Sequence, residues 1–196
     1  MLLHDVVTAS DRAGRTASRK DKIGLFADLL RHASPEETPV VVSWLSGALP
    51  QGRIGLGPAA VRDAWPEEAA AAPGLAMLEV DAAFGRMAGL QGPGSTTDRV
   101  RLLGSLLQRA TPPEQDFLAR LAVGELRQGA LESLVADAVA RANDVPASAV
   151  RRALQLSGDL PAVAAAARRG RPQHTPLPPA RHRPRSPMRL RRRRRR

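Results

Sequence analysis

The feature that most constrains the fold is an internal repeat, because residues 18–52 align with residues 95–129 without a gap, at an offset of 77 positions. Twelve of the 35 aligned positions are identical. The identities fall at helix caps, at apolar core positions and in a closing turn that reads G-x-L-x-Q-G in both copies. Agreement of all three kinds in one register indicates duplication of a helix–helix–turn unit.

Each copy carries the same helix signals. The pattern S-x-x-D occurs at 18–21 and again at 95–98, and it is the sequence signature of a capping box at a helix start. Leucines at helical spacing follow, and a Ser-Pro or Thr-Pro pair then restarts a second helix. We expect that second helix to end at Gly47 in the first copy and at Gly124 in the second.

The rest of the chain before its end is also helical in pattern. Further helices are predicted over 2–12, 75–90, 131–142, 146–157 and 159–167, with a short helix and a connector between 57 and 74. The one extended piece that the sequence suggests is Arg53–Gly57. Hydrophobic residues make up 43% of the chain but aromatic residues only 3%, so the core must be Leu, Val and Ala packing, which suits helices. The predicted fold class is all-α.

Charge divides the chain into two parts. Residues 1–159 hold 17 Lys and Arg against 19 Asp and Glu, whereas residues 160–196 hold 13 Arg and no acid. The Arg- and Pro-rich end has no apolar period and cannot bury enough surface to offset its chain entropy. We therefore expect a helical domain over 1–167 and a disordered basic tail over 168–196. Any polyanion that the domain binds must be held by local placement of charge.

The sequence lacks the residue patterns that several kinds of chemistry require. Cysteine is absent, and the histidines at 4, 32, 174 and 182 show no ligand spacing on an expected helix, so we predict no metal site. The stretch GRIGLG at 52–57 follows a helix rather than a strand, and G-K-S/T does not follow it, so we predict no nucleotide loop there. No catalytic residue is predicted.

We expect no membrane partner and no secretion signal. No stretch reaches the roughly 18 apolar residues that a membrane-spanning helix needs. The first twelve residues carry Asp5 and lack a basic start followed by a long apolar run. The expected location is the cytoplasm of a bacterial cell, in association with the nucleoid.

The repeated turn has two interpretations. In one, its glycines only cap helices and its leucine anchors the core. In the other, the second glycine of each turn lets the backbone approach a ligand, and the nearby Gln and Arg hold phosphate oxygens without reading sequence. Two such turns, related by an approximate two-fold axis, could grip both strands of a duplex. On this second interpretation the candidate phosphate-contacting residues are Gln51, Gly52 and Arg53 in the first turn and Arg127, Gln128 and Gly129 in the second.

Residues 1–167 resemble the N-terminal DNA-binding domain of ATP-dependent DNA ligases, most closely of the actinobacterial type. The stretches that carry the resemblance are SRKDKIGLFADLLRHASPEETPVVVSWLSGALPQGRIGLG, LEVDAAF, LLGSLLQRATPPEQDFLARLAVGELRQGALESLVADAVARA and VPASAVRRALQLSGDLPAVA. Both G-x-L-x-Q-G turns and the LSGDL segment occur in the family's order. The resemblance implies an all-helical, duplicated module that contacts the minor groove on both sides of a nick, in DNA repair, replication and recombination. Carried over by position, the resemblance implies that one strand's backbone contacts Gly47, Gln51, Gly52 and Arg53 and that the other contacts Gly124, Arg127, Gln128 and Gly129. We expect the module to act as a monomer on nicked double-stranded DNA.

The sequence departs from the family in one respect that concerns catalysis. A ligase of this type continues into an adenylation domain whose K-x-D-G lysine takes AMP, but the chain's lysines, Lys20 and Lys22, do not stand in that motif. We therefore expect a truncated ligase in which ATP and Mg²⁺ would belong to the missing catalytic domain. The Arg- and Pro-rich tail is then interpreted as out-of-frame translation. The alternative is a helical scaffold or protein-interaction module whose nucleic-acid binding comes only from the tail.

Overall fold

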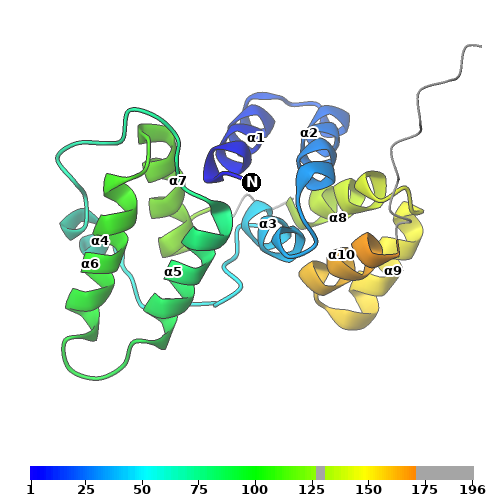
Figure 1. Cartoon of the computed structure of the whole chain (residues 1–196). Coiled ribbons are helices and arrows are strands. Elements are labelled where there is room, and N and C mark those ends of the chain that lie inside the picture. The colour runs from blue at the N-terminus through cyan, green and yellow to red at the C-terminus, as the bar shows by residue number, and fades with distance from the viewer. Residues whose placement is uncertain (127–130, 171–196) are drawn as a thin grey trace, which may run out of the picture.

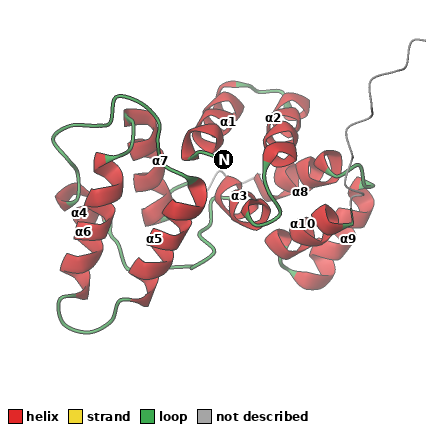
Figure 2. Ribbon diagram, in the orientation of Figure 1, coloured by secondary structure: helices red, strands yellow, loops and turns green. Residues whose placement is uncertain are grey.

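The computed structural model describes residues 1–126 and 131–170, and within these residues the chain forms ten helices and no strand (Figures 1 and 2). The helices are α1 (Leu3–Arg15), α2 (Arg19–His32), α3 (Glu37–Leu45), α4 (Pro58–Asp63), α5 (Met77–Gly89), α6 (Ser95–Gln108), α7 (Pro112–Val123), α8 (Leu131–Ala142), α9 (Ala147–Ser157) and α10 (Leu160–Arg169). The all-α prediction is confirmed. Residues 53–57 pair with no neighbouring strand, and the expected disorder of the tail falls, from residue 171 onward, outside the described residues.

The helices pack as two lobes (Figure 1). The first lobe contains α1–α3 together with α8–α10, and the second lobe contains α4–α7. Helix α2 packs along α8 and α3 packs along α10, whereas α6 packs against α4, α5 and α7. The duplicated units thus lie in different lobes, with α2–α3 in the first and α6–α7 in the second. Contacts of α1 with α7 and of α3 with α5 join the lobes.

An aromatic cluster lies where the lobes meet. Trp44 on α3 is 1% exposed, and its ring centroid lies 6.3 Å from that of Phe84 on α5 and 6.3 Å from that of Phe117 on α7. The ring of Trp44 meets Phe84 edge-on, at an interplanar angle of 75°, which is a favoured arrangement for aromatic pairs. The junction between the lobes therefore uses three of the five aromatic side chains that the chain possesses.

Most helix ends follow the predicted signals. Ser18 accepts a hydrogen bond from the backbone N–H of Asp21 at the start of α2, and Thr111 and Glu114 form a capping box at the start of α7. The expected cap at Ser95 is wrong, because Gly94, at φ +85°, is the N-cap of α6 and Ser95 is already helical. The last helix also continues two residues beyond its expected end at 167.

Polar contacts fix the C-terminal helices onto the first lobe. Asp137 on α8 accepts hydrogen bonds from Arg19 on α2 at 2.9 Å and from Arg151 on α9 at 2.6 Å. Arg168 on α10 donates to the backbone carbonyls of Arg31 and Ala33 at the end of α2, where the helix dipole favours a positive charge. The residues from α8 to α10 are therefore part of the same folded unit as the first repeat.

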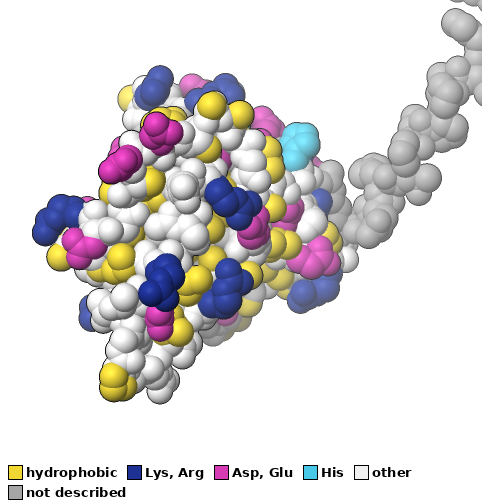
Figure 3. Space-filling view, turned by 60° about the vertical axis from the view of Figure 1, so that its left-hand side comes forward, with side chains coloured by type: hydrophobic (Ala, Val, Ile, Leu, Met, Phe, Trp, Pro, Cys, Tyr) yellow, Lys and Arg dark blue, Asp and Glu magenta, His cyan; other side chains and the backbone are white. Residues whose placement is uncertain are grey.

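The surface of the folded part carries mixed charge. On the face shown in Figure 3, the Lys and Arg side chains are interspersed with Asp and Glu. This distribution agrees with the near balance of charge in residues 1–159. No helix in the described part of the chain is both long enough and apolar enough to cross a membrane.

Candidate functional site

The two copies of the repeated turn meet at one hollow between the lobes. The hollow has a volume of about 560 Å³. Its lining residues come from two segments, 47–56 after α3 and 121–124 at the end of α7. The structure thus brings Gly47, Gly52 and Arg53 of the first turn together with Gly124 of the second. Segments that are 77 residues apart in the sequence share this single surface.

The first turn leaves α3 through a left-handed glycine. Gly47 has φ +76°, and its backbone N–H donates to the carbonyl of Trp44 at 2.9 Å. The N–H of Ala48 donates to the carbonyl of Ser43 at 2.9 Å, which closes the helix end. This is the αL termination that the sequence predicted for Gly47. Leu49 of the turn packs against the core, as expected for an anchoring side chain.

After Gly52 the chain alternates between exposed and buried residues. Gly52, at φ +68°, and Arg53 are exposed, whereas Ile54 is 2% exposed and anchors the segment in the core. The backbone N–H groups of Arg53 and Gly55 donate to no acceptor among the described residues. The Arg53 guanidinium likewise forms no ion pair within the described part of the chain. The segment therefore presents a free cation and free backbone donors at the hollow.

Gln51 holds the first turn onto the second lobe. Its side-chain amide nitrogen donates to the Asp81 carboxylate at 2.9 Å and to the Asp81 backbone carbonyl at 3.3 Å. Asp81 lies on α5, so this side chain links the turn after α3 to the neighbouring lobe. The Gln51 amide nitrogen thus positions the turn, and contact of Gln51 with a ligand stays a prediction.

The second turn is described as far as Leu126. Gly124 has φ +76° and ends α7, and the N–H of Glu125 donates to the carbonyl of Arg120 at 2.8 Å. Leu126 is buried, as is expected for the leucine of the repeat. The candidate residues Arg127, Gln128 and Gly129 lie outside the described residues. The structure therefore places Gly124 at the hollow, and the other three candidates of the second turn remain predictions.

Two residues of the site region were not found by sequence reasoning. Arg99 on α6 donates to the carbonyls of Met87 and Leu90 and to the Ser95 hydroxyl, and its guanidinium lies where a Cβ on Gly55 would be 3.1 Å away. The Arg99 guanidinium therefore packs next to Gly55 and supports the 53–57 segment. No spacing rule signals this role, because the Met87 and Leu90 carbonyls lie at the end of another helix.

The second residue missed is Glu125, which is the position after Gly124 in the second turn. It is exposed, and its carboxylate has no partner among the described residues. The aligned position of the first turn is Ala48, so the two turns differ in charge at this point. This difference is visible in the repeat alignment, but it is not one of the identities that the two copies share. In the described part of the chain, no group of His, Asp and Glu is arranged to hold a metal ion.

Comparison with known proteins places this fold in a family. Residues 67–140 match the family model for the DNA ligase N terminus. A probable DNA ligase of Anaeromyxobacter sp. (strain Fw109-5) is 55% identical over 168 residues, which are 85% of this chain and 32% of that protein. A probable DNA ligase of Mycobacterium avium (strain 104) is 54% identical over 172 residues, 87% of this chain and 32% of that protein. The chain spans about a third of the length of the curated relatives it matches. The resemblance predicted from the repeated turns is confirmed, and this chain carries the N-terminal domain of the DNA ligase family.

Proposed function

We propose that this chain is the DNA-binding module of a DNA ligase and that its two repeated turns contact the sugar–phosphate backbone of duplex DNA at a nick. The observation that carries the proposal is the hollow between the lobes, which both copies of the turn line. A duplication that serves only helix capping gives no reason for the two turns to meet. A shared binding surface gives such a reason.

The chemistry of the first turn suits phosphate oxygens. Arg53 and the free N–H groups of Arg53 and Gly55 are donors that contact phosphates without reading the base sequence. The glycines allow the DNA backbone to approach the protein backbone closely. Because residues 1–159 carry no net positive charge, with 17 Lys and Arg against 19 Asp and Glu, affinity should depend on these local donors and should fall as salt rises.

The glycines of the turns support a role outside internal packing. A Cβ added to Gly52 or to Gly124 would meet no heavy atom within 4 Å. The protein therefore leaves open space beside both residues, although each needs a positive φ. We propose that DNA occupies this space. In that arrangement, one lobe contacts the duplex on one side of the nick and the other lobe contacts it on the other side.

A nick gives a physical reason for preference over intact duplex. Bending or widening continuous duplex costs energy, of the order of 1–6 kcal/mol for bends of 40–90° over a site of 20–30 base pairs. An interrupted strand lowers that cost at the break. A two-lobed module that fits a deformed duplex should therefore bind nicked DNA more tightly than intact DNA.

We further propose that this chain binds nicks without sealing them. Neither Lys20 nor Lys22 stands in K-x-D-G, and both lie at the start of α2. Covalent adenylation, ATP and Mg²⁺ would then belong to residues that this chain does not contain. Incubation of the chain with labelled ATP and Mg²⁺ tests this, and a covalent AMP adduct would show that the proposal is wrong.

The decisive experiment measures binding with and without residues 171–196. Fluorescence anisotropy at fixed ionic strength would compare nicked duplex, intact duplex of the same sequence, and single strand. We expect the shortened chain to keep its preference for the nicked duplex and the full chain to bind all three more tightly. If the preference vanishes with the tail, the helical part is a scaffold and the tail supplies the nucleic-acid binding. Sedimentation of the complex tests whether one chain binds each nick.

A further inference from the structure

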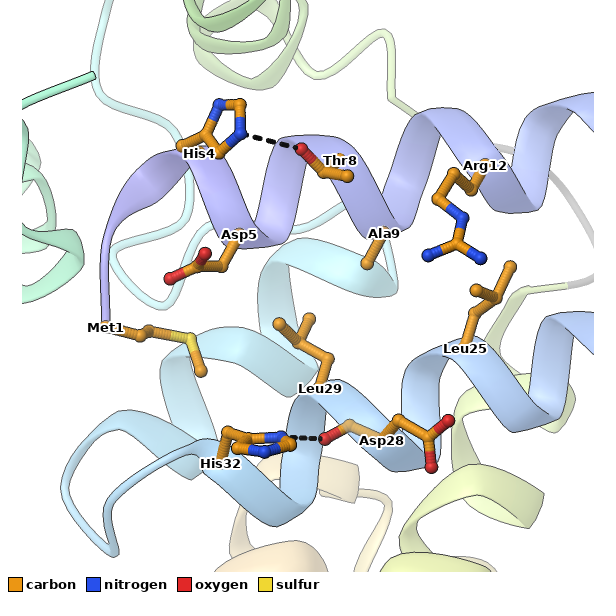
Figure 4. Close-up of a pocket in the computed structure, with 10 residues that line it drawn as sticks. All are labelled: Met1, His4, Asp5, Thr8, Ala9, Arg12, Leu25, Asp28, Leu29 and His32. Atoms are coloured by element: carbon orange, nitrogen blue, oxygen red, sulfur yellow. Dashed lines mark hydrogen bonds between the residues drawn. The ribbon is translucent and has the colours of Figure 1, made fainter. Parts of the chain in front are cut away.

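A groove separate from the repeated turns runs between α1 and α2. At one end, a hollow of about 460 Å³ is lined by residues of both helices, among them Arg12, Asp28 and His32 (Figure 4). At the other end, a second hollow of about 530 Å³ lies beside Arg15 and Lys20. Arg12, Leu25 and Asp28 line both hollows, so that the two form one continuous groove.

The floor of the groove is apolar. Leu25 and Leu29 of α2 face Ala9 of α1 between the two helices, and Met1 lies at the open end (Figure 4). Ala9 and Leu29 are each 8% exposed, so the floor belongs to the core, and Leu25 packs against the core. A ligand that reaches this floor must therefore present at least one apolar group.

The rim of the groove is positive at its α2 N-terminal end. Arg12, Arg15, Lys20 and Arg141 are exposed there, and none of them forms an ion pair with a described residue. Two of the carboxylates nearby already form an ion pair or a hydrogen bond within the protein. Asp28 pairs with Arg31 at 2.5 Å, and Asp5 accepts a hydrogen bond from the N–H of Leu2 at the start of α1. Two of the groove's three carboxylates, Asp5 and Asp21, form no ion pair in the described part, so two negative charges stand against the four cations, and Asp5 lines the other hollow.

We propose that this groove binds an acidic peptide segment that carries apolar side chains. Helix α1 has 13 residues and is therefore about 20 Å long at a rise of about 1.5 Å per residue. An extended chain at about 3.3 Å per residue would cover that length with about six residues. The apolar floor receives the apolar side chains, and the basic rim receives the carboxylates. Duplex DNA offers phosphates but no apolar side chain that could reach a floor recessed between two helices.

The test measures binding of a fluorescein-labelled peptide of four glutamates, three leucines and one glycine to the full chain at about 0.15 M salt, where charges beyond a Debye length of about 8 Å are screened. One control peptide has serine for each leucine, and another has lysine for each glutamate. The groove variant is Arg15→Ala with Lys20→Ala, which changes exposed side chains only. The matched variant is Arg62→Ala, because Arg62 is exposed on α4 and outside the groove. Residues 171–196 are present in every protein, so their contribution is common to all.

We expect the groove variant to bind the peptide on the order of fivefold more weakly, as two partly screened ion pairs imply, and Arg62→Ala to bind it unchanged. The serine peptide should bind on the order of tenfold more weakly than the leucine peptide, because it cannot bury apolar surface. The proposal is overturned if both variants bind equally, or if the serine peptide binds as tightly as the leucine peptide. It is also overturned if the groove variant loses nicked-duplex affinity to the same extent, since the groove would then belong to the DNA interface.

Discussion

At the scale of single residues, the glycines of the repeated turns allow the effect of backbone conformation to be distinguished from the effect of contact with DNA. Gly52 needs glycine for its φ of +68° but not for space inside the protein, since a Cβ would meet nothing within 4 Å. Asparagine tolerates the left-handed region better than other side chains. Replacement by asparagine therefore keeps the turn and fills the space beside it.

We expect Gly52→Asn to weaken binding of nicked duplex by tenfold or more while lowering the free energy of unfolding by less than about 1 kcal/mol. Anisotropy titration and thermal unfolding measure the two effects. The control is Gly57→Asn, because Gly57 is also exposed with open space but has φ −107° and is the N-cap of α4. That variant should leave nicked-duplex binding unchanged and should raise the free energy of unfolding slightly, because asparagine is a better N-cap than glycine. Equal binding by Gly52→Asn and the wild type would contradict contact at this turn.

Glu125 bears on how much each of the two turns contributes to DNA affinity. An exposed carboxylate one residue after Gly124 should repel a phosphate that approaches the second turn. We expect Glu125→Gln to tighten nicked-duplex binding about threefold at low salt, because removing one like charge is worth under 1 kcal/mol at an exposed site. The gain should shrink as salt rises. Glu67→Gln, at an exposed position outside both turns, should change nothing, and a similar gain there would point to net charge alone.

At the scale of helices, the sequence predicted what local signals determine. Ser18 caps its helix as expected because a cap depends on residues three positions apart, and a helix begins at the Thr111–Pro112 pair as expected. Ser95 shows the limit, since Gly94 adopts a left-handed conformation and starts the helix one residue earlier. The role of Arg99 was not predictable for a related reason. Its carbonyl partners lie at the end of another helix, and no local spacing encodes that contact.

The ion pairs of α8 give a prediction about pH. Burial of Asp137 is the largest single influence on its pKa and raises it, but hydrogen bonds and charges from Arg151 and Arg19 together outweigh burial and lower the pKa below its usual value. A lowered pKa in the folded state means that the stabilisation is fully present above the unfolded-state pKa of about 3.9 and is lost as pH falls through the folded-state value.

We therefore expect Asp137→Asn to lower the free energy of unfolding by about 1 kcal/mol near neutral pH, a modest cost because the two arginines are more than half exposed. The difference from the wild type should stay constant down to about pH 5 and shrink below about pH 4, where the wild-type carboxylate takes up a proton. Denaturant titrations over this range measure it. Asp28→Asn, which removes an exposed pair within one helix, should have a smaller effect. A difference that grows in acid would contradict the assignment.

At the scale of the whole molecule, the sequence predicted a repeat but not the place where its turns meet. That placement depends on how the lobes pack, and the packing depends on Trp44 touching Phe84 and Phe117 from the other lobe. The backbone carbonyl of Trp44 also accepts the hydrogen bond from Gly47 that begins the first turn. Trp44 thus contributes to both the junction and the turn. The alignment of the two copies pairs Trp44 with Leu121 and does not indicate this double role.

This double role predicts a separation between stability and binding. Trp44→Leu and Phe26→Leu each remove a fully buried aromatic ring, and each should lower the free energy of unfolding by about 2–4 kcal/mol. Phe26 lies on α2 and takes no part in the ring contacts of Trp44 with Phe84 and Phe117. Binding is compared under conditions where both variants are folded. Trp44→Leu should then bind nicked duplex about threefold to tenfold more weakly, a loss of about 1 kcal/mol of binding free energy. The reason is that the loosened junction no longer fixes the spacing of the turns. Phe26→Leu should bind like the wild type. Equal affinities in the two variants would mean that the spacing of the turns does not depend on the aromatic junction.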